Sequence, residues 1–187
     1  MKKLPILLLL VFFYSAVAYG QEDKLKKIKT LYAETNAKIA KSKLPDEEGW
    51  GNLYSTELLV NANNGSWRAC GNYTNKIVFW YNDQPGCQED QNLPNNSVLV
   101  KIEIKTSCAA LTFTEEYLYD QGKLVFCFKT DNLGDKSLQE FRYYIADRKL
   151  FRYQENQNLI KDISKVGVDD LIKKSEKLTN LFIQTFN

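Results

Sequence analysis

Three acidic side chains in one short segment are the residues best suited by type to chemistry. Glu115, Glu116 and Asp120 lie beside tyrosines in a stretch with strand-like composition. A glycosidase needs two carboxylates roughly 5–10 Å apart, but adjacent residues of a strand point to opposite faces of its sheet. Glu115 and Glu116 are therefore not expected to line one site together. A solvated strand edge, or pairing with a basic side chain such as Arg142, is the simpler interpretation.

Histidine is absent from the chain. Its absence excludes Ser-His-Asp and Cys-His catalysis and removes the commonest metal ligand. The sequence also lacks a Walker loop, a dinucleotide fingerprint, an EF-hand loop and a CxxC pair. We therefore predict no catalytic residue, no metal site and no cofactor, and the sequence favours a protein without enzymatic activity.

Aromatic residues make up 13% of the chain and concentrate in the predicted strands. Most are expected to fill a core, where each buries a large area. An exposed aromatic face could instead bind a protein, a peptide or a glycan. Trp50 is the best candidate for exposure, because Gly49 and Gly51 flank it in a polar loop. The candidate ligand-binding residues are Trp50, Trp67, Trp80, Tyr117, Tyr119 and Tyr143.

The first 20 residues have the order of a secretory signal peptide. Lys2 and Lys3 precede an apolar run, and Ala18-Tyr19-Gly20 places small residues where signal peptidase reads them. A spanning helix needs roughly 20 apolar residues, more than this run supplies. We expect residues 1–20 to be removed and residues 21–187 to form a single domain without an integral membrane segment. The expected location is the periplasm, the cell surface or the medium.

Cleavage would also change the charge of the chain. Lys+Arg would fall from 25 to 23 against 23 Asp+Glu, so the net charge of +2 would become zero. A nucleic-acid-binding protein would need a clear positive excess, so nucleic acid is not an expected partner. Lysines do crowd the segment 24–43, either as a solvated helix face or as a contact with an anionic surface.

Four cysteines are disulfide candidates in an exported chain: Cys70, Cys87, Cys108 and Cys127. An even count suggests two disulfides, which allow three connectivities. Proximity in the sequence favours Cys70–Cys87 with Cys108–Cys127. The register expected for the hairpin around Gly122 counts against the second pair, and free buried thiols remain an alternative.

Amphipathic helices are predicted at both ends of the chain, over 23–43 and 168–186. The first carries its apolar stripe at Leu25, Ile28, Tyr32, Thr35 and Ile39, and the second at Leu171, Ser175, Leu178, Phe182 and Thr185. Between them, alternating and apolar runs bounded by turn residues predict seven or eight strands. The run 77–81 is apolar on both sides, which is typical of a strand covered on both faces.

Two hairpins share one plan at a spacing of 26 residues. Asp120-Gln121-Gly122-Lys123 and Ala146-Asp147-Arg148-Lys149 each follow a tyrosine-rich strand, and Leu opens each return strand. With Gln121 and Gly122 as the turn, Tyr119 is expected to face Leu124 and Tyr117 to face Phe126.

The segments 116–126, 141–144 and 149–153 resemble a loose group of exported bacterial proteins with a tyrosine-rich hairpin followed by an Arg-Tyr-Tyr strand. The resemblance implies a bacterial, exported, β-rich domain and assigns no site residue.

These patterns together predict an α+β domain, in which an antiparallel β-meander carries both helices on one face of the sheet. The expected function is that of an exported, non-enzymatic binding or interaction protein of the bacterial envelope. The alternative is a hydrolase or inhibitor that acts through an acidic or loop site.

Overall fold

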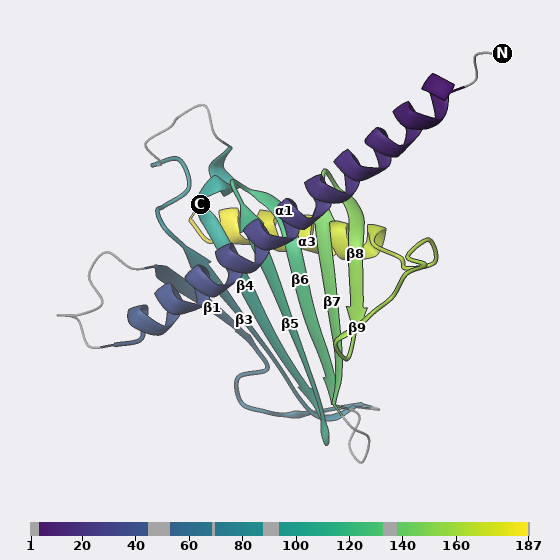
Figure 1. The fold of residues 1–187 in the computed structure, drawn as a ribbon. Coiled ribbons are helices and arrows are strands. Elements are labelled where there is room, and N and C mark those ends of the chain that lie inside the picture. The colour runs from purple at the N-terminus through teal and green to yellow at the C-terminus, as the bar shows by residue number, and fades with distance from the viewer. Residues whose placement is uncertain (1–3, 45–52, 69, 88–93, 133–137, 187) are drawn as a thin grey trace.

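The computed structural model describes residues 4–44, 53–68, 70–87, 94–132 and 138–186. Within these residues, a nine-stranded antiparallel sheet lies between two helices (Figure 1). The predicted α+β fold class is therefore confirmed. The two helices are α1 (Leu4–Ser42) and α3 (Asp169–Gln184).

The sheet is a meander with the spatial order β1-β3-β4-β5-β6-β7-β8-β9, and the short β2 pairs with β3. Successive antiparallel strands need only short turns between them, as the sequence predicts. The stretches 67–73 and 76–81 each have the composition of a strand, but 71–73 and 76–81 belong to one long strand, β3, and Trp67 to β2. The strands are β1 (Tyr54–Val60), β2 (Ser66–Trp67), β3 (Gly71–Tyr81), β4 (Leu99–Cys108), β5 (Leu111–Asp120), β6 (Lys123–Asn132), β7 (Gln139–Ala146), β8 (Lys149–Glu155) and β9 (Asn158–Leu159).

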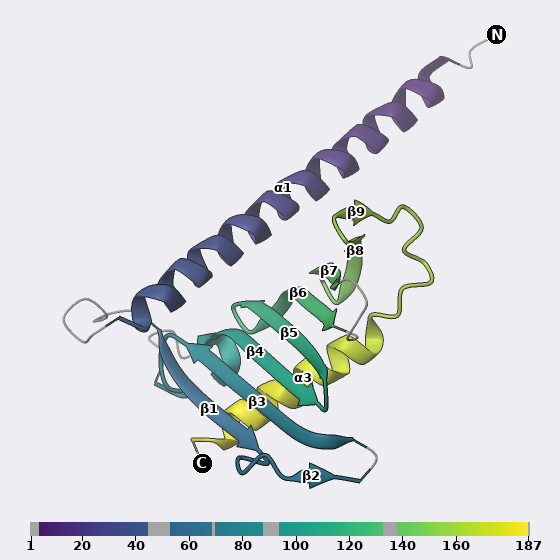
Figure 2. The same cartoon turned by 90° about the horizontal axis from the view of Figure 1, so that it is seen from below.

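Helix α1 runs without a break through the predicted cleavage position after Gly20. Its N-terminal part projects beyond the sheet (Figure 2), and Leu25 is the first side chain of α1 described as buried. The predicted stripe is confirmed, because Leu25, Ile28, Thr35 and Ile39 are buried and Tyr32 is half-buried. No helix in the described part of the chain has an apolar stretch long enough to cross a membrane.

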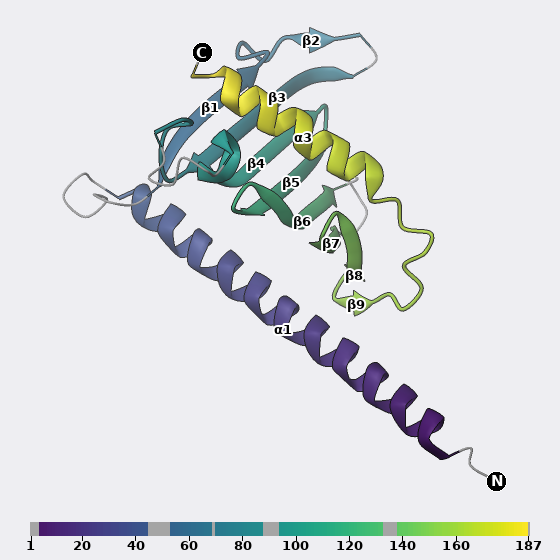
Figure 3. The same cartoon turned by 90° about the horizontal axis from the view of Figure 1, so that it is seen from above.

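The two helices cover opposite faces of the sheet, so the prediction that both lie on one face is wrong (Figure 3). Helix α1 packs its Leu25 and Ile28 against Leu118, Phe126 and Tyr144. Helix α3 packs against the alternate residues of the same strands, and its contacts include Phe79, Ile102, Tyr117, Tyr119 and Cys127. Because neighbouring residues of a strand point to opposite faces, both faces need an apolar cover.

The 26-residue repeat extends to the backbone. In the β5–β6 turn Gln121 and Gly122 have φ of 50° and 76°, and in the β7–β8 turn Asp147 and Arg148 have φ of 50° and 62°. Positive φ at both central residues is the requirement of a type I′ turn, whose twist matches that of a hairpin. The Asn96 side chain contacts Gly122, and its Nδ2 donates to the Gly122 carbonyl at 3.1 Å. A Cβ at Gly122 would collide with the Asn96 side chain.

Each repeated hairpin also carries a β-bulge at the same place. The pairing shifts between Leu118 and Tyr119 in the first hairpin and between Tyr144 and Ile145, 26 residues later, in the second. The predicted pairing of Tyr119 with Leu124 is confirmed. Beyond the bulge the prediction is wrong, and Tyr117 faces Cys127 because one extra residue lies in β6.

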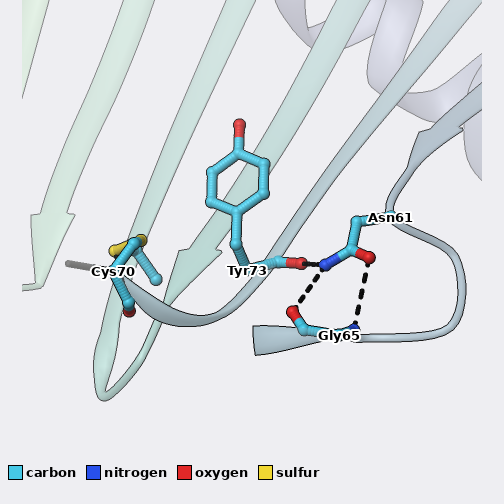
Figure 4. The surroundings of a disulfide bond; sticks show 5 residues. Asn61, Gly65, Cys70 and Tyr73 are labelled. Carbon is cyan, nitrogen blue, oxygen red and sulfur yellow. Dashed lines mark hydrogen bonds between the residues drawn. A yellow bond between two sulfur atoms is a disulfide. The ribbon is translucent and has the colours of Figure 1, made fainter. Parts of the chain in front are cut away.

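The disulfide joins Cys70 to Cys108, with their Cα atoms 5.7 Å apart (Figure 4). The predicted pairs Cys70–Cys87 and Cys108–Cys127 are therefore wrong. Pairing of β3 with β4 places Tyr73 opposite Cys108, which brings the residues just before β3 to the end of β4. Cys87 is an exposed free thiol, while Cys127 is buried beneath α3.

Beside the disulfide, Asn61 closes its turn by donating its amide to the carbonyls of Gly65 and Tyr73. The chain between β1 and β2 is thereby tied to the start of β3.

Peptide mapping under non-reducing conditions tests this cysteine arrangement. We expect a Cys70–Cys108 cross-link, rapid alkylation of Cys87 in the folded protein, and alkylation of Cys127 only after unfolding, because its thiol is fully buried. A cross-link between Cys70 and Cys87 would contradict the described pairing of β3 with β4.

Replacing Cys108 tests what the disulfide contributes to stability. The bond spans a sequence separation of 38 residues, and a loop of that length predicts a loss of about 4 kcal/mol in the free energy of unfolding for Cys108→Ala. Cys87→Ala is the matched control, since Cys87 is free and exposed. Denaturant unfolding measures both variants, and an equal loss in both would refute the prediction.

Candidate functional site

The sheet opens between its two repeated hairpins. Pairing of β6 with β7 extends from Asp131–Gln139 to Phe126–Tyr144 and stops there. The next residues toward the turns, Leu124 and Val125 on β6 and Ile145 and Ala146 on β7, face one another without ladder pairing. Because both hairpins carry bulges at this level, their ends splay apart. We name the gap between the two turns, which both helices border, the hairpin cleft.

The hairpin cleft has a volume of about 800 Å³. This volume lies within the range of small-molecule sites, which are usually apolar with a few polar groups. Its walls come from both helices and from strands β5, β6 and β7, because α1 approaches from one face of the sheet and α3 from the other. The main wall residues are Ile28, Leu124, Val125, Ile145, Ile172 and Tyr119.

Ion pairs connect both helices to the hairpin turns at the rim of the cleft. Lys27 Nζ lies 2.7 Å from Asp120 Oδ2, and Lys24 Nζ lies 3.8 Å from Asp147 Oδ2. On the α3 side, Arg148 of the second turn pairs with Glu176. These side chains are mostly solvent-exposed, and exposed ion pairs contribute little to stability. The rim pairs can therefore open without unfolding the sheet.

The rim carries one more cation than acid. Lys123 also lines the cleft and is exposed, and it makes no ion pair among the described residues. The other charged lining residues form the three rim pairs. An anionic group at the mouth of the cleft would therefore find an available partner in Lys123.

Polar groups deep in the cleft are hydrogen-bonded to each other. Tyr119 and Ser175 share a hydrogen bond of 2.8 Å between their hydroxyl oxygens, and the Thr179 hydroxyl donates to the Ser175 carbonyl. Burial raises the pKa of Tyr119 to about 12, although its hydrogen bonds with Ser175 and Thr179 act in the opposite direction. The phenol therefore stays protonated, and the arrangement is suited to orienting a ligand rather than to proton transfer.

A second polar cluster lies under the middle of α1, around the fully buried Lys101. Only 2% of Lys101 is exposed. Its Nζ lies 2.9 Å from Glu103 Oε1 and 2.8 Å from Glu116 Oε2, and it donates to Asn36 Oδ1 at 2.8 Å. The Tyr32 hydroxyl donates to Glu116 at 2.6 Å, with the lysine ammonium 5.2 Å from the centre of its ring. Every proton of the buried ammonium thus has an acceptor.

The Glu103 carboxylate of this cluster is held in the ionised form. Partial burial alone would raise the pKa of Glu103, but hydrogen bonds from Lys101 and the Trp80 indole, with the charge of Lys101, lower it below the usual value. The same balance applies to Glu115 on the other face. Burial acts to raise its pKa, but Lys174, Tyr117 and Lys129 together lower it. Carboxyl groups whose pKa is lowered in this way carry no proton near neutral pH and are therefore poor general acids.

The residues predicted as ligand contacts separate into three groups. Trp80, Tyr117 and Tyr119 are buried in the core, although the Tyr119 hydroxyl borders the cleft. Trp67 is 48% exposed and stacks on Tyr73, and Tyr143 is half-buried on the α3 face. Trp50 lies outside the described residues.

Sequence patterns did not predict the Lys101 cluster. The alternation of 98–104 places Lys101 and Glu103 on one face, as the structure does, but nothing in that pattern indicates that Lys101 is buried. Tyr32 and Asn36 were the available signal, because a polar pair one helical turn apart sits beside the apolar stripe of α1. The described residues contain no group of three or more His, Cys, Asp or Glu side chains able to hold a metal ion.

Substitution of Lys101 tests the role of the buried cluster. Lys101→Met leaves Glu103 and Glu116 without their cation, and loss of one partner from a buried pair predicts about 3 kcal/mol of destabilisation. Lys76→Met is the matched control, because Lys76 is exposed and pairs with an exposed glutamate. Denaturant unfolding at neutral pH measures both. Equal stability of the two variants would mean that the cluster contributes nothing beyond a surface pair.

The cluster also predicts a dependence of stability on pH. A carboxyl whose pKa is lower in the folded state contributes stability above its unfolded pKa, and that contribution is lost as the pH falls through the folded pKa. For Glu103 and Glu115 the free energy of unfolding should decrease as the pH falls below the ordinary value of 4.5. Lys101→Met should flatten this decrease, and Lys76→Met should not. The same slope in both variants would show that Lys101 is not the cause of the lowered pKa of Glu103.

No family model, no curated protein and no solved structure was found to match this chain.

Proposed function

We propose that the chain is an exported, non-enzymatic binding protein of the bacterial envelope that holds a small amphipathic molecule in the hairpin cleft. The observation that carries the proposal is an apolar cleft of about 800 Å³ where the sheet opens between two hairpins. An apolar pocket with few convergent polar groups is the usual form of a ligand site.

The charges of the rim favour a ligand with an anionic head group. Its apolar body would lie against the cleft walls, where burial of apolar surface contributes about 25 cal/mol per Å². Its head group would lie near Lys123 and the rim lysines of α1. The signal-like N-terminus and the disulfide support an exported protein, since disulfides persist in oxidising compartments.

Catalysis finds less support in the same geometry. The half-buried carboxylates with shifted pKa values, Glu103 and Glu115, are shifted downwards and bound to lysines. A hydrolase acting through a pair of carboxyl groups would need one of them protonated at working pH. The hairpin cleft itself has phenol and hydroxyl groups deep inside it, and the acids that line it, Asp120, Asp147 and Glu176, are held in ion pairs at its rim.

Filling the cleft tests the proposed function. Dansyl-labelled undecanoic acid reports binding by its fluorescence, and phenylnaphthylamine serves as an uncharged probe. Ala146→Trp places a large side chain in the cleft and should weaken binding of both probes by about tenfold or more, because close-packed sites do not absorb added volume. Ala62→Trp is the matched control in an exposed turn. Failure of the wild-type protein to bind either probe would reject the proposal.

Lys123→Ala tests the head-group preference separately. Loss of its charge should weaken binding of the carboxylate probe several-fold and leave binding of the uncharged probe unchanged. High salt should reduce the same difference, since exposed charges are screened. Equal effects on both probes would exclude a charge-selective rim.

A further inference from the structure

The α3 face of the sheet is only partly covered. Helix α3 crosses the strands behind the sheet as a single band (Figure 1), and a helix with its side chains is about 10 Å wide. Strand β5 has 10 residues, which extend over ~34 Å. The strand ends away from the repeated turns therefore emerge beyond α3. Lys174 of α3 reaches Glu115, which marks the border of the covered part.

Beyond this border lies a shallow pocket of about 470 Å³, which we name the open face. It borders Glu115 and is lined by half-buried side chains of four strands: Thr106, Phe113, Lys129, Asp131, Phe141 and Tyr143.

The strand register explains why these side chains meet. Thr106, Phe113 and Asp131 are successive cross-strand partners, and in the next row Glu115, Lys129 and Phe141 are partners. Directly opposed side chains in a sheet lie about 5 Å apart. The open face is therefore a compact grid in which aromatic rings alternate with charged groups.

The polar groups of the open face include both donors and acceptors that can reach a ligand. The Asp131 carboxylate and the Thr106 hydroxyl make no side-chain hydrogen bond or ion pair within the described residues. Lys129 Nζ lies 3.3 Å from Glu115 Oε2, and Lys174 pairs with the same carboxylate. The two acids and two lysines balance in charge. A strongly charged ligand of either sign would meet a like charge at close range, whereas a neutral ligand with many hydroxyls would meet partners for both of its hydrogen-bonding roles.

Aromatic rings continue beyond the pocket along the same face. Tyr73 on β3 shares the face of Ile77 and Phe79, by strand alternation, and Trp67 stacks on it with ring centroids 4.4 Å apart. Four strand spacings separate Tyr73 from Phe141, ~19 Å measured across the strands. Half-buried rings in such a row, with the exposed Trp67 at its end, offer flat apolar surfaces to a ligand that is extended rather than compact.

We propose that the open face is a second binding site, separate from the hairpin cleft, for a neutral oligosaccharide. A sugar ring has an apolar C–H face that packs on an aromatic ring and a rim of hydroxyls that both donate and accept. Phe113, Phe141 and Tyr143 provide the aromatic surfaces, while Asp131, Lys129 and Thr106 provide the hydrogen-bonding groups. The length of the aromatic row fits a chain of several sugars better than a single one.

A glycan array of neutral oligosaccharides, followed by calorimetry on the strongest hit, tests the proposal with the purified protein. We expect at least one neutral oligosaccharide to bind. Asp131→Ala should weaken that binding by about tenfold, as expected for the loss of a charge-assisted hydrogen bond, and Phe113→Ala should do the same by removing a ring. Binding of the cleft probes should stay unchanged in both variants, because Phe113 and Asp131 each lie six residues along their strands, ~20 Å, from the nearest cleft residues, Tyr119 and Val125.

Two matched controls separate binding from folding. Asp23→Ala removes an exposed acid of α1, and Phe128→Ala removes a half-buried ring from the opposite face of the same sheet. Both should retain oligosaccharide binding. Absence of any neutral oligosaccharide hit, equal losses in Phe113→Ala and Phe128→Ala, or binding of a basic peptide alone would each overturn the proposal. The cleft probes would still report on the proposed function independently.

Discussion

The buried ammonium of Lys101 is the interaction that determines how α1 lies on the sheet. A charge removed from water must be fully paired, and two strands supply only the carboxylates of Glu103 and Glu116. The remaining acceptor comes from Asn36, so the cluster is complete only when α1 is in place. Apolar contacts on either side of the cluster would tolerate a shifted helix, whereas the hydrogen bonds would not. The cluster therefore sets the register of α1, and with it the positions of Lys24 and Lys27 at the rim of the hairpin cleft.

β-Bulges determine which side chains face each side of the sheet and where neighbouring strands separate. The pairing of β3 with β4 also shifts, between Trp80 and Tyr81, so that Leu99 enters the core under α3 while Lys101 points toward α1. Without that extra residue the two side chains would share a face. The equivalent bulges of the repeated hairpins lie at the same end of the sheet, where β6 and β7 separate. The same local feature, a β-bulge that adds one residue to a strand, thus produces both the buried lysine and the open cleft.

Local patterns in the sequence predicted the elements well, because periodicity and turn chemistry depend on neighbours in the chain. The stripe of α1, both repeated turns and most strand limits follow from them. The faces of the helices and the disulfide do not, because they depend on registers between distant segments. The apolar run 77–81 did indicate a strand covered on both sides, which agrees with helices on opposite faces. That observation was in conflict with the predicted one-sided packing, and the physical requirement to cover Phe79 and Trp80 at once was the stronger guide.

The two ends of the sheet differ because two helices cannot cover a wide sheet uniformly. At the end with the repeated turns, α1 and α3 both reach the strands, so the space between them is partly enclosed and more apolar than polar. At the other end α3 does not cover the strands, and their aromatic side chains face outwards among charged groups. The apolar cleft favours an apolar ligand, whose surface is removed from water on binding. The shallow surface, which is both aromatic and charged, favours a polar ligand that stays hydrated along one edge. The same meander can therefore present two chemically distinct surfaces along its strands, while the Lys101 cluster holds α1 in place on one face of the sheet.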